Sequence, residues 1–407
     1  MAAHTIRNVS HEGIGYAVVD LPDVRHLFVA AVPRSGDTLR QQADDVLRAI
    51  DDAAAAEGAR GSLVLQSVFI ADAGQIDECH QIMREFYGRD LPATSYVPQR
   101  PCGGELLSIE AMGVGQGLGE VKIDRPSEQI VIARHDDIAW VHCAQVLPQP
   151  HVTGMYDTAA NAFQQMRSLF DGVNVRFEQV VRTWLYLGGI VAEEGAVQRY
   201  RELNRARTDF YHDIPFLTNH LHQGCSGPIY PASTGIGADG RGIMMAAIAL
   251  VTNRKDVVAV PLENPRQTAA YEYDARYSAK SPKFSRAMAL SCGPCATIFV
   301  SGTASITHSE TRHVGDAVAQ TQETLENIAA LISEENLARH GLPGLGSSLK
   351  SLGLLRVYVK RQEDYARTRA VCEKYVGDLP TIYAVADVCR PELLVEIEAV
   401  AFSRKPG

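Results

Sequence analysis

Two glutamates near the end of the chain, Glu396 and Glu398, stand two residues apart in the segment DVCRPELLVEIEAVA (387–401). The segment is rich in strand-forming apolar residues, and on a strand this spacing places both carboxylates on one face. Two interpretations fit such a pair. Either the face is wet and the carboxylates are solvated, or the strand lines a pocket in which a carboxylic acid can donate a proton.

The composition and charge of the sequence argue against several classes of function. The 407 residues are 46% hydrophobic and 21% charged, which is typical of a globular protein of two or three domains. The net charge of −9 is spread along the chain and argues against nucleic-acid binding. No apolar run approaches the ~18 residues of a membrane span, and the start MAAHTIRNVSHEG lacks a secretory hydrophobic segment. We therefore expect a cytoplasmic protein that binds neither nucleic acid nor membrane.

The 8 cysteines are scattered, as in proteins with reduced thiols. Cys292 and Cys295 form a CxxC motif without a second pair or a histidine at zinc spacing. We therefore expect a turn between strands at this motif, and no metal site.

One order of elements occurs three times: a helix, a strand, a second helix, a proline turn and a closing strand. The first helices are expected to begin at acidic caps, Asp37, Asp157 and Asp316. The strands after them are 63–72, 180–189 and 354–364, and the closing strands are 105–113, 243–251 and 393–401. Strands with helices on one side indicate an α+β fold.

The irregular spacing of the repeats indicates three divergent domains. We place them at 1–118, 119–255 and 256–407. A long stretch rich in proline and tyrosine precedes the third repeat, and a connector of this length is more often functional than idle.

Comparison of the repeats distinguishes the two interpretations of the glutamate pair. Our alignment places Ser108 and Ala246 at the position of Glu396, whereas Glu110 is equivalent to Glu398. A solvated strand face would keep a polar residue in every copy. We therefore expect one competent site per chain, with Glu396 as its acid and Glu398 in a supporting or structural role.

The repeats resemble the RidA (YjgF) family, whose trimers have ligand sites at subunit interfaces. In the third copy SPKFSRAM and TIFVSGTASI resemble the opening pattern of that family, and LLVEIEAVA resembles its ending. The resemblance implies three RidA-like (chorismate-mutase-like) domains fused as a pseudo-trimer, and hence a monomer.

A narrower resemblance covers residues 180–400. The motifs that carry it are RTWLYL, RYRELNRARTDFY, YPASTGIG, PLENPRQTAAYEY, SPKFSRAM, SGTASI and VCRPELLVEIE, in this order. They are similar to those of the chorismatase family, whose members remove pyruvate from chorismate. Residues 1–118 depart from the family pattern, because they form a fuller first copy that cannot be matched motif by motif.

This resemblance implies a cofactor-free enzyme that converts chorismate to 3-hydroxybenzoate and pyruvate, with Glu396 protonating the enolpyruvyl methylene carbon. Chorismate carries two carboxylates, for which arginine is the suited bidentate partner. The candidate substrate-binding residues are Asn204, Arg205, Tyr211, Tyr273, Arg286 and Arg369. Gly302 and Cys389 match the positions that accompany 3-hydroxybenzoate formation in the family, so we expect them to determine the product.

Other functions stay open at this point. A chorismatase that forms the dihydrodiol is one, and a RidA-like imine hydrolase is another. Imine-hydrolysing members carry an arginine in the proline turn, whereas the aligned positions here are Thr94, Ser233 and Thr381. A non-catalytic small-molecule binding protein is the third alternative, and the retained Glu396 argues against it.

Overall fold

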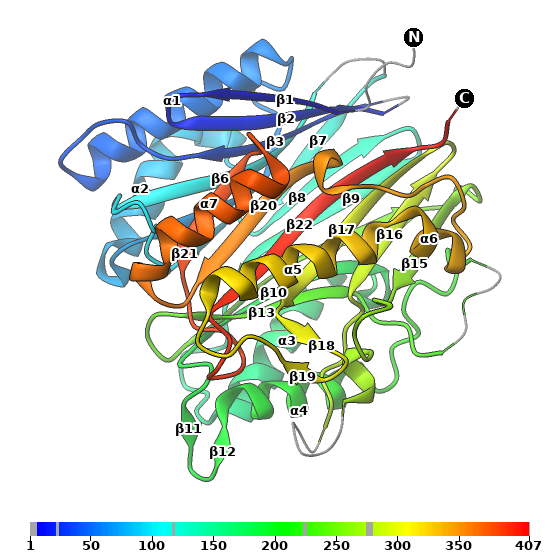
Figure 1. Ribbon diagram of the computed structural model, residues 1–407. Helices are drawn as coiled ribbons and strands as arrows, with labels where there is room; N and C mark the ends of the chain where they lie inside the picture. Colours follow the sequence, from blue (N-terminus) through cyan, green and yellow to red (C-terminus); the bar gives the residue numbers. More distant parts are fainter. Residues whose placement is uncertain are drawn as a thin grey trace.

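The computed structural model (Figure 1) describes residues 6–21, 24–115, 119–222, 225, 227–273 and 280–406. Three six-stranded sheets form its framework. The connector expected before the third repeat is described on both sides of residues 274–279, which lie outside the described residues. Within the described part of the chain, no helix is both long and apolar enough to cross a membrane.

The first sheet has the strand order β1-β2-β3-β6-β4-β5. Its strands are β1 (Ile6–His11), β2 (Ile14–Asp20), β3 (Arg25–Ala31), β4 (Leu63–Ile70), β5 (Ala93–Val97) and β6 (Leu107–Gly115). Its helices are α1 (Leu39–Ala56) and α2 (Ile76–Tyr87). Thr38 caps α1 through a capping box with Gln41, so the prediction of Asp37 as the cap is wrong by one residue.

The second sheet has the order β13-β10-β14-β9-β8-β7. Its strands are β7 (Lys122–Ser127), β8 (Ile130–His135), β9 (Ile138–Val146), β10 (Val180–Gly188), β13 (Ala232–Ala238) and β14 (Ile243–Thr252). Helices α3 (Met155–Asp171) and α4 (Arg199–Tyr211) belong to it, with a small hairpin of β11 (Glu193–Glu194) and β12 (Val197–Gln198). Gly154 is the N-cap of α3, so Asp157 does not cap it and instead lies in its first turn.

The third sheet has the order β15-β16-β17-β22-β20-β21. Its strands are β15 (Val257–Leu262), β16 (Ala287–Cys292), β17 (Cys295–Ala304), β20 (Leu352–Val359), β21 (Thr381–Val385) and β22 (Val395–Arg404). Its helices are α5 (Ala317–Ile332), α6 (Glu334–Arg339) and α7 (Tyr365–Val376), and β18 (Ile306–Thr307) pairs with β19 (Glu310–Thr311). Asp316 caps α5 as predicted. The predicted turn between Cys292 and Cys295 is also confirmed, since these residues face each other across the β16–β17 hairpin.

Read in the same direction, the three sheets have one strand order. Three antiparallel strands are followed by the closing strand and then by two parallel strands at the other edge. The opening strands were not predicted from the sequence, and the outermost strands β5, β13 and β21 were predicted only as proline turns. Each of these three begins immediately after a proline, and its parallel partner lies one helix earlier in the chain, where local sequence patterns do not reveal the pairing.

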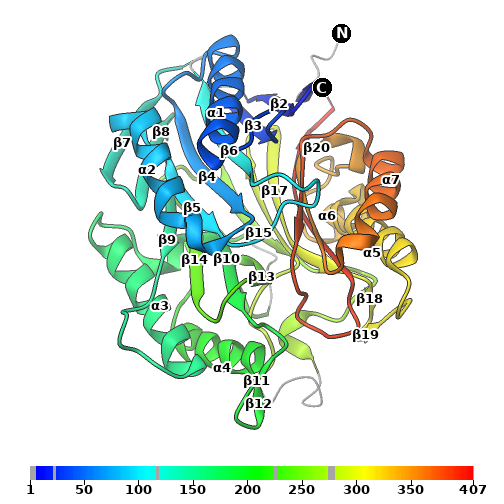
Figure 2. The same cartoon turned by 90° about the vertical axis from the view of Figure 1, so that its left-hand side faces the viewer.

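Alternate residues along a strand such as β20 pack into two different hydrophobic cores, one on each face of the sheet. On β20, Leu355 and Val357 pack with the helices of the third sheet, whereas Leu354 and Tyr358 face the core shared between the sheets. Figure 2 shows the helices of each sheet at the outside of the molecule, with the sheets between them. The sheets contact one another in a cycle, β5 with β9, β13 with β17, and β21 with β3.

Candidate active site

A cavity of about 390 Å³ lies where β13 and α4 of the second sheet meet β17 and β22 of the third. Its lining includes six of the residues singled out from the sequence: Asn204, Tyr273, Arg286, Gly302, Cys389 and Glu396. These residues come from segments almost two hundred positions apart in the chain, and only the contact between the two sheets brings them together.

Three glutamates line this cavity, and Glu396 is the buried one. Its side chain is 4% exposed, and it accepts no hydrogen bond from the described residues. Burial and the nearby charge of Glu398 together raise the pKa of Glu396 to about 8, although the charges of Arg182 and Arg286 oppose the shift. A carboxyl group in this state is protonated at neutral pH and can donate its proton.

Glu398 lies on the same face of β22 but in a different environment. Trp184 Nε1 and Arg182 Nη2 donate hydrogen bonds to it at 2.9 and 2.7 Å, and Arg356 Nη1 lies 2.9 Å away. Burial pushes the pKa of Glu398 upward, but Arg356 and Arg182 outweigh burial and hold it below its usual value. The solvated-face interpretation is therefore wrong, and the two glutamates take opposite protonation states.

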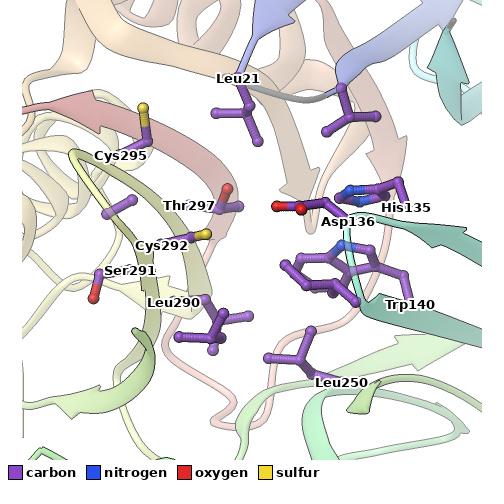
Figure 3. Close-up of a pocket in the computed structure, with 14 residues that line it drawn as sticks. Leu21, His135, Asp136, Trp140, Leu250, Leu290, Ser291, Cys292, Cys295 and Thr297 are labelled. Atoms are coloured by element: carbon purple, nitrogen blue, oxygen red, sulfur yellow. The ribbon is translucent and has the colours of Figure 1, made fainter. Parts of the chain in front are cut away.

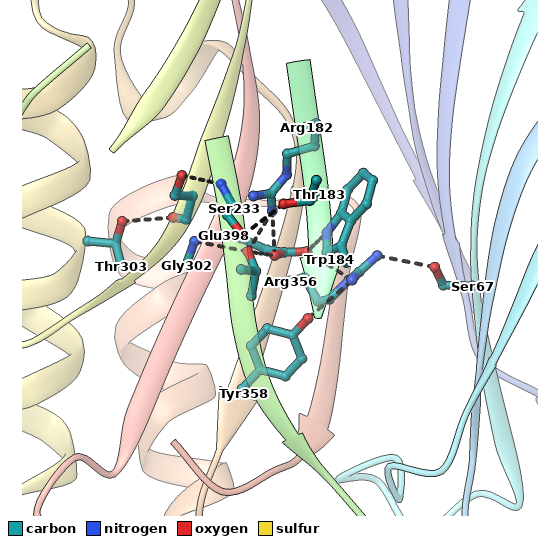
Figure 4. A network of polar contacts seen from close by, with 12 residues as sticks. Ser67, Arg182, Thr183, Trp184, Ser233, Gly302, Thr303, Arg356, Tyr358 and Glu398 are labelled. Atoms are coloured by element: carbon teal, nitrogen blue, oxygen red, sulfur yellow. Dashed lines mark hydrogen bonds and ion pairs between the residues drawn. The ribbon is translucent and has the colours of Figure 1, made fainter. Parts of the chain in front are cut away.

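The network around Glu398 joins all three sheets (Figure 4). Arg356 on β20 binds Glu110 of β6 in two places, with 2.5 Å between Nη2 and Oε1 and 2.9 Å between Nε and Oε2. It also donates to the hydroxyls of Tyr186 and Tyr358 at 2.7 and 3.1 Å. Two guanidinium groups and two carboxylates thus share a buried site.

Four arginines line the cavity, and two of them, Arg207 and Arg286, are buried. Arg286 donates to Thr268 O at 2.8 Å and to Tyr273 Oη at 2.5 Å. Arg207 donates to Asn204 Oδ1 at 2.5 Å and to Ser233 Oγ at 3.4 Å. None of these partners is a carboxylate.

Both guanidinium groups are buried, and both lie 5.5 Å from the ring of Phe284. Each keeps an Nε atom without a hydrogen-bond partner among the described residues. The pair therefore retains donors and charge for an anionic ligand.

Three sequence-predicted residues lie outside the cavity. Arg205 is 49% exposed and pairs with Glu202, and Arg369 is 54% exposed and pairs with Glu373. Tyr211 is buried among aromatic side chains, with its ring 4.9 Å from that of Phe216. The structure therefore does not support their assignment to substrate binding.

Sequence reasoning missed Arg207, although a signal for it existed. Residues two apart on a helix face different directions, so Arg205 and Arg207 cannot share one role. Asn204 and Arg207, three apart, lie on the buried side of α4 together with Leu203. The helical period would have selected Arg207.

The strand registers correct one step of the repeat alignment. Glu398 pairs with Arg356, and the equivalent pair in the second sheet is Ala246 with Trp184. Two residues earlier on each closing strand, Glu396 therefore corresponds to Met244, and Ala246 corresponds to Glu398. The conclusion survives, because neither Met244 nor Ser108 can act as an acid.

The same registers show a further difference between the three sheet contacts. Gly235 pairs with Leu185, and the equivalent positions are Tyr96 opposite Val68 and Tyr383 opposite Val357. A β-carbon on Gly235 would lie 3.0 Å from Cε2 of Tyr200, which lines the cavity. The cavity thus forms at the contact where glycine replaces tyrosine.

A second cavity, of about 50 Å³, lies at another junction of the sheets (Figure 3). Leu21, Trp140, Leu250 and Leu290 give it a largely apolar lining. It has roughly a third of the ~150 Å³ that admits a benzene molecule, so it is too small for a substituted ring. Among the described residues, no three His, Cys, Asp or Glu side chains are grouped so that they could hold a metal ion.

Known proteins match this chain in two regions. The family described as "Chorismatase FkbO/Hyg5-like, N-terminal" matches residues 120–249, and "Endoribonuclease L-PSP" matches residues 279–403. A 3-hydroxybenzoate synthase of Streptomyces hygroscopicus is 36% identical over 278 residues, which cover 65% of this chain and 76% of that protein. The chain belongs to the chorismatase family. The family predicted from the sequence motifs is therefore confirmed, and so is the prediction that the protein is an enzyme of the chorismatase type.

Further relatives agree with this result. A chorismatase of Streptomyces rapamycinicus is 35% identical over 275 residues, covering 65% of this chain and 77% of that protein. A crystal structure of a chorismatase matches the fold with a TM-score of 0.63 at 23% identity, covering 94% of this chain and all of that one. Residues 1–118 of this chorismatase precede both matched family regions.

Proposed function

We propose that this chorismatase converts chorismate to 3-hydroxybenzoate and pyruvate, without a cofactor, in the cavity between the second and third sheets. The observation that carries the proposal is Glu396, a buried carboxylic acid with a pKa of about 8, in a cavity that is also lined by two buried arginines, Arg207 and Arg286. A neutral proton donor beside two cations matches a substrate that is a dianion and a vinyl ether.

Glu396 donates its proton to the methylene carbon of the enolpyruvyl group, and an oxocarbenium ion forms at the neighbouring carbon. The ring 4-hydroxyl then displaces this activated group and loses its own proton, so that pyruvate leaves. The arene-oxide-like intermediate aromatises to 3-hydroxybenzoate. One proton enters and one leaves, hence the two products together are isomeric with chorismate and no water is consumed.

Arg207 and Arg286 bind the two substrate carboxylates in this proposal. Their buried donors without partners among the described residues support this role, and the ring of Phe284, 5.5 Å from each guanidinium group, lines the same cavity and can pack against the substrate. Asn204 and Tyr273 position the two guanidinium groups through the hydrogen bonds described above. Gly302 and Cys389 line the same cavity, and we propose that they influence the product.

The proposal extends to the architecture. Residues 1–118, 119–255 and 256–407 are proposed to be three RidA-like domains that form a pseudo-trimer within one chain, with one competent interface. The common strand order of the three sheets and their cyclic contacts support it. A pseudo-trimer completes within one polypeptide what RidA proteins assemble from three, so we expect a monomer in the cytoplasm.

Purified protein incubated with chorismate tests the function. Pyruvate is followed with lactate dehydrogenase, and the ring product is identified by chromatography against 3-hydroxybenzoate, 4-hydroxybenzoate and the dihydrodiol. We expect stoichiometric pyruvate and 3-hydroxybenzoate. Absence of pyruvate would contradict chorismatase activity, and the dihydrodiol as main product would contradict the subtype. Release of a keto acid from an added imine, with chorismate untouched, would favour the RidA-like alternative.

A further inference from the structure

Glu110 is a buried carboxylate of the first sheet that points away from its own sheet. It is 4% exposed, and both of its oxygens bind Arg356, which belongs to the third sheet. Burial raises the pKa of Glu110, and the guanidinium of Arg356 opposes that shift. Glu110 does not line the cavity, so any part it has in the reaction must be indirect.

Arg356 links Glu110 to Glu398, which lies two residues from Glu396 on β22. Its Nη1 lies 2.9 Å from Glu398 Oε1, while Arg182 from the second sheet holds Glu398 Oε2 at 2.7 Å. The network therefore contains two positive and two negative groups, contributed by three sheets, and removal of any one charge leaves it unbalanced.

The network reaches the cavity through a short chain of contacts. Thr234 Oγ1 donates to Glu398 and accepts a hydrogen bond from Gly302 N at 2.9 Å. Gly302 in turn lies against the carboxyl of Glu396. A change in the charge or position of Arg356 can therefore affect Glu396 in two ways. It changes the electrostatic potential at the Glu396 carboxyl, and it can move the backbone of Gly302, which contacts that carboxyl.

We infer that Glu110 is a positioning residue of the reaction: it fixes Arg356 on Glu398 and so keeps Glu396 in its proton-donating form. The inference rests on the proposed function, and it gives the first 118 residues a part in catalysis. These residues supply Glu110, the fourth charged group of the network beside Arg182, Arg356 and Glu398.

The surroundings of Glu396 determine the sign of the effect. Among the described residues, the charged or titratable groups that line the cavity or interact with Glu396 are Glu398 on its own strand, Arg182 on β10, Glu193 on β11, Tyr200, Arg201 and Arg207 on α4, Tyr273 and Arg286 before β16, and Cys389, Arg390 and Glu392 before β22. None of them belongs to the first sheet. Loss of the Glu110 charge leaves two cations against one anion in the network, and this excess positive charge favours the carboxylate form of Glu396.

Glu110→Gln tests the inference through the pH dependence of kcat with chorismate. The alkaline limb should move to lower pH by on the order of one unit, which lowers the rate about fivefold at pH 8 and about tenfold well above it, with KM and the rate near pH 6 close to the wild type. The matched control is Glu57→Gln, which removes another buried first-sheet carboxylate that pairs with Arg7 at 2.6 Å. The control should keep the wild-type profile, which excludes a general effect of destabilising the first sheet.

A second readout does not depend on turnover. Difference infrared spectra between a protein and its Glu396→Gln form report the protonation of this one carboxyl, and its titration should shift to lower pH in the Glu110→Gln background. If wild-type protein leaves chorismate unchanged, the proposed function fails while this titration still decides the inference. An unshifted titration in a folded Glu110→Gln protein overturns it.

Arg356→Gln provides the opposite charge change, should Glu110→Gln not fold. It leaves two carboxylates against one cation, so the titration of Glu396 should move to higher pH. The double variant Glu110→Gln/Arg356→Gln restores neutrality and should return it toward the wild-type position. A titration of Glu396 that is the same in Arg356→Gln as in the wild type also overturns the inference.

Discussion

Gly302 lies against the carboxyl of Glu396, so close that a β-carbon at position 302 would stand 2.1 Å from Oε1 and 3.0 Å from Cδ. The same β-carbon would lie 3.0 Å from Cγ2 of Thr234. The absence of a side chain at 302 is thus a condition for the position of the acid. This contact adds to the sequence-based hypothesis, in which Gly302 affects only which product forms.

Gly302→Ala should therefore lower pyruvate release as well as change the product. The added methyl group must displace the Glu396 carboxyl, and misplacement of a proton donor by about 1 Å can cost ~100-fold in rate. Cys389→Ala opens space at the cavity wall without touching the acid, so it should keep pyruvate release and shift the product toward the non-aromatic diol. Coupled pyruvate assays and chromatography of both variants, alone and combined, measure this. Wild-type rates in Gly302→Ala would show that the acid tolerates the methyl group.

Glu396→Gln should reduce kcat by about 10²–10⁴-fold, because the amide keeps the shape but has no proton to give. In the wild type, activity should be highest below pH 8 and fall tenfold per pH unit above it. The sign follows from the raised pKa of about 8: the acid is protonated below this value and loses its proton as the pH rises through it. An alkaline limb near pH 5, or a Glu396→Gln protein with wild-type turnover, would remove Glu396 from the mechanism.

The same pKa predicts a stability change. Between pH 4.5, the ordinary value, and about 8, folded Glu396 binds a proton that the unfolded chain has released, so stability falls as the pH rises. Glu396→Gln removes this cost and should raise the free energy of unfolding at pH 8, by on the order of 4 kcal/mol, with little change at pH 4. Denaturant unfolding at the two pH values measures it.

Glu398→Gln is the contrasting variant. The pKa of Glu398 is lowered, so its charge stabilises the folded protein above the ordinary pKa, and that contribution is lost as the pH falls. Its removal leaves Arg182 and Arg356 short of a partner and should destabilise the protein by about 3–5 kcal/mol. Equal effects of the two glutamine variants would contradict their opposite environments.

Arg207 and Arg205 form a natural pair for testing the substrate-binding arginines. Arg207→Ala and Arg286→Ala should each lower kcat/KM by at least about 100-fold, since each removes a buried charge-assisted contact. Lysine should rescue poorly, because it lacks the planar fork. Arg205→Ala, two residues away on the exposed side of α4, should behave as the wild type. A larger loss in Arg205→Ala than in Arg207→Ala would restore the sequence-based assignment.

Local chemistry in the sequence was sufficient to single out Glu396, its strand and Arg286 as residues of one cavity, because each lies in a motif with a distinct composition. It was not sufficient for Arg207, because α4 carries four arginines, two of which, Arg199 and Arg207, are buried, and only Arg207 of these two lines the cavity. The network of Glu110, Arg182 and Arg356 could not be predicted from the sequence for another reason. Its members come from three sheets, and nothing in a single segment shows that they meet.

Gly235→Tyr tests why only one of the three sheet contacts holds this cavity. The tyrosine copies the residue at the same register position in the first and third sheets, Tyr96 and Tyr383, and tyrosine suits a strand. The protein should therefore fold, while the new ring displaces Tyr200 and fills the cavity, and kcat/KM for chorismate should fall more than about 100-fold. Gly235→Ala is the graded control. Its β-carbon at 3.0 Å from Tyr200 requires that ring to move by only a few tenths of an ångström, so KM should rise modestly with kcat retained. Wild-type kcat/KM in a folded Gly235→Tyr protein would show that the absence of a side chain at this position is not what opens the site.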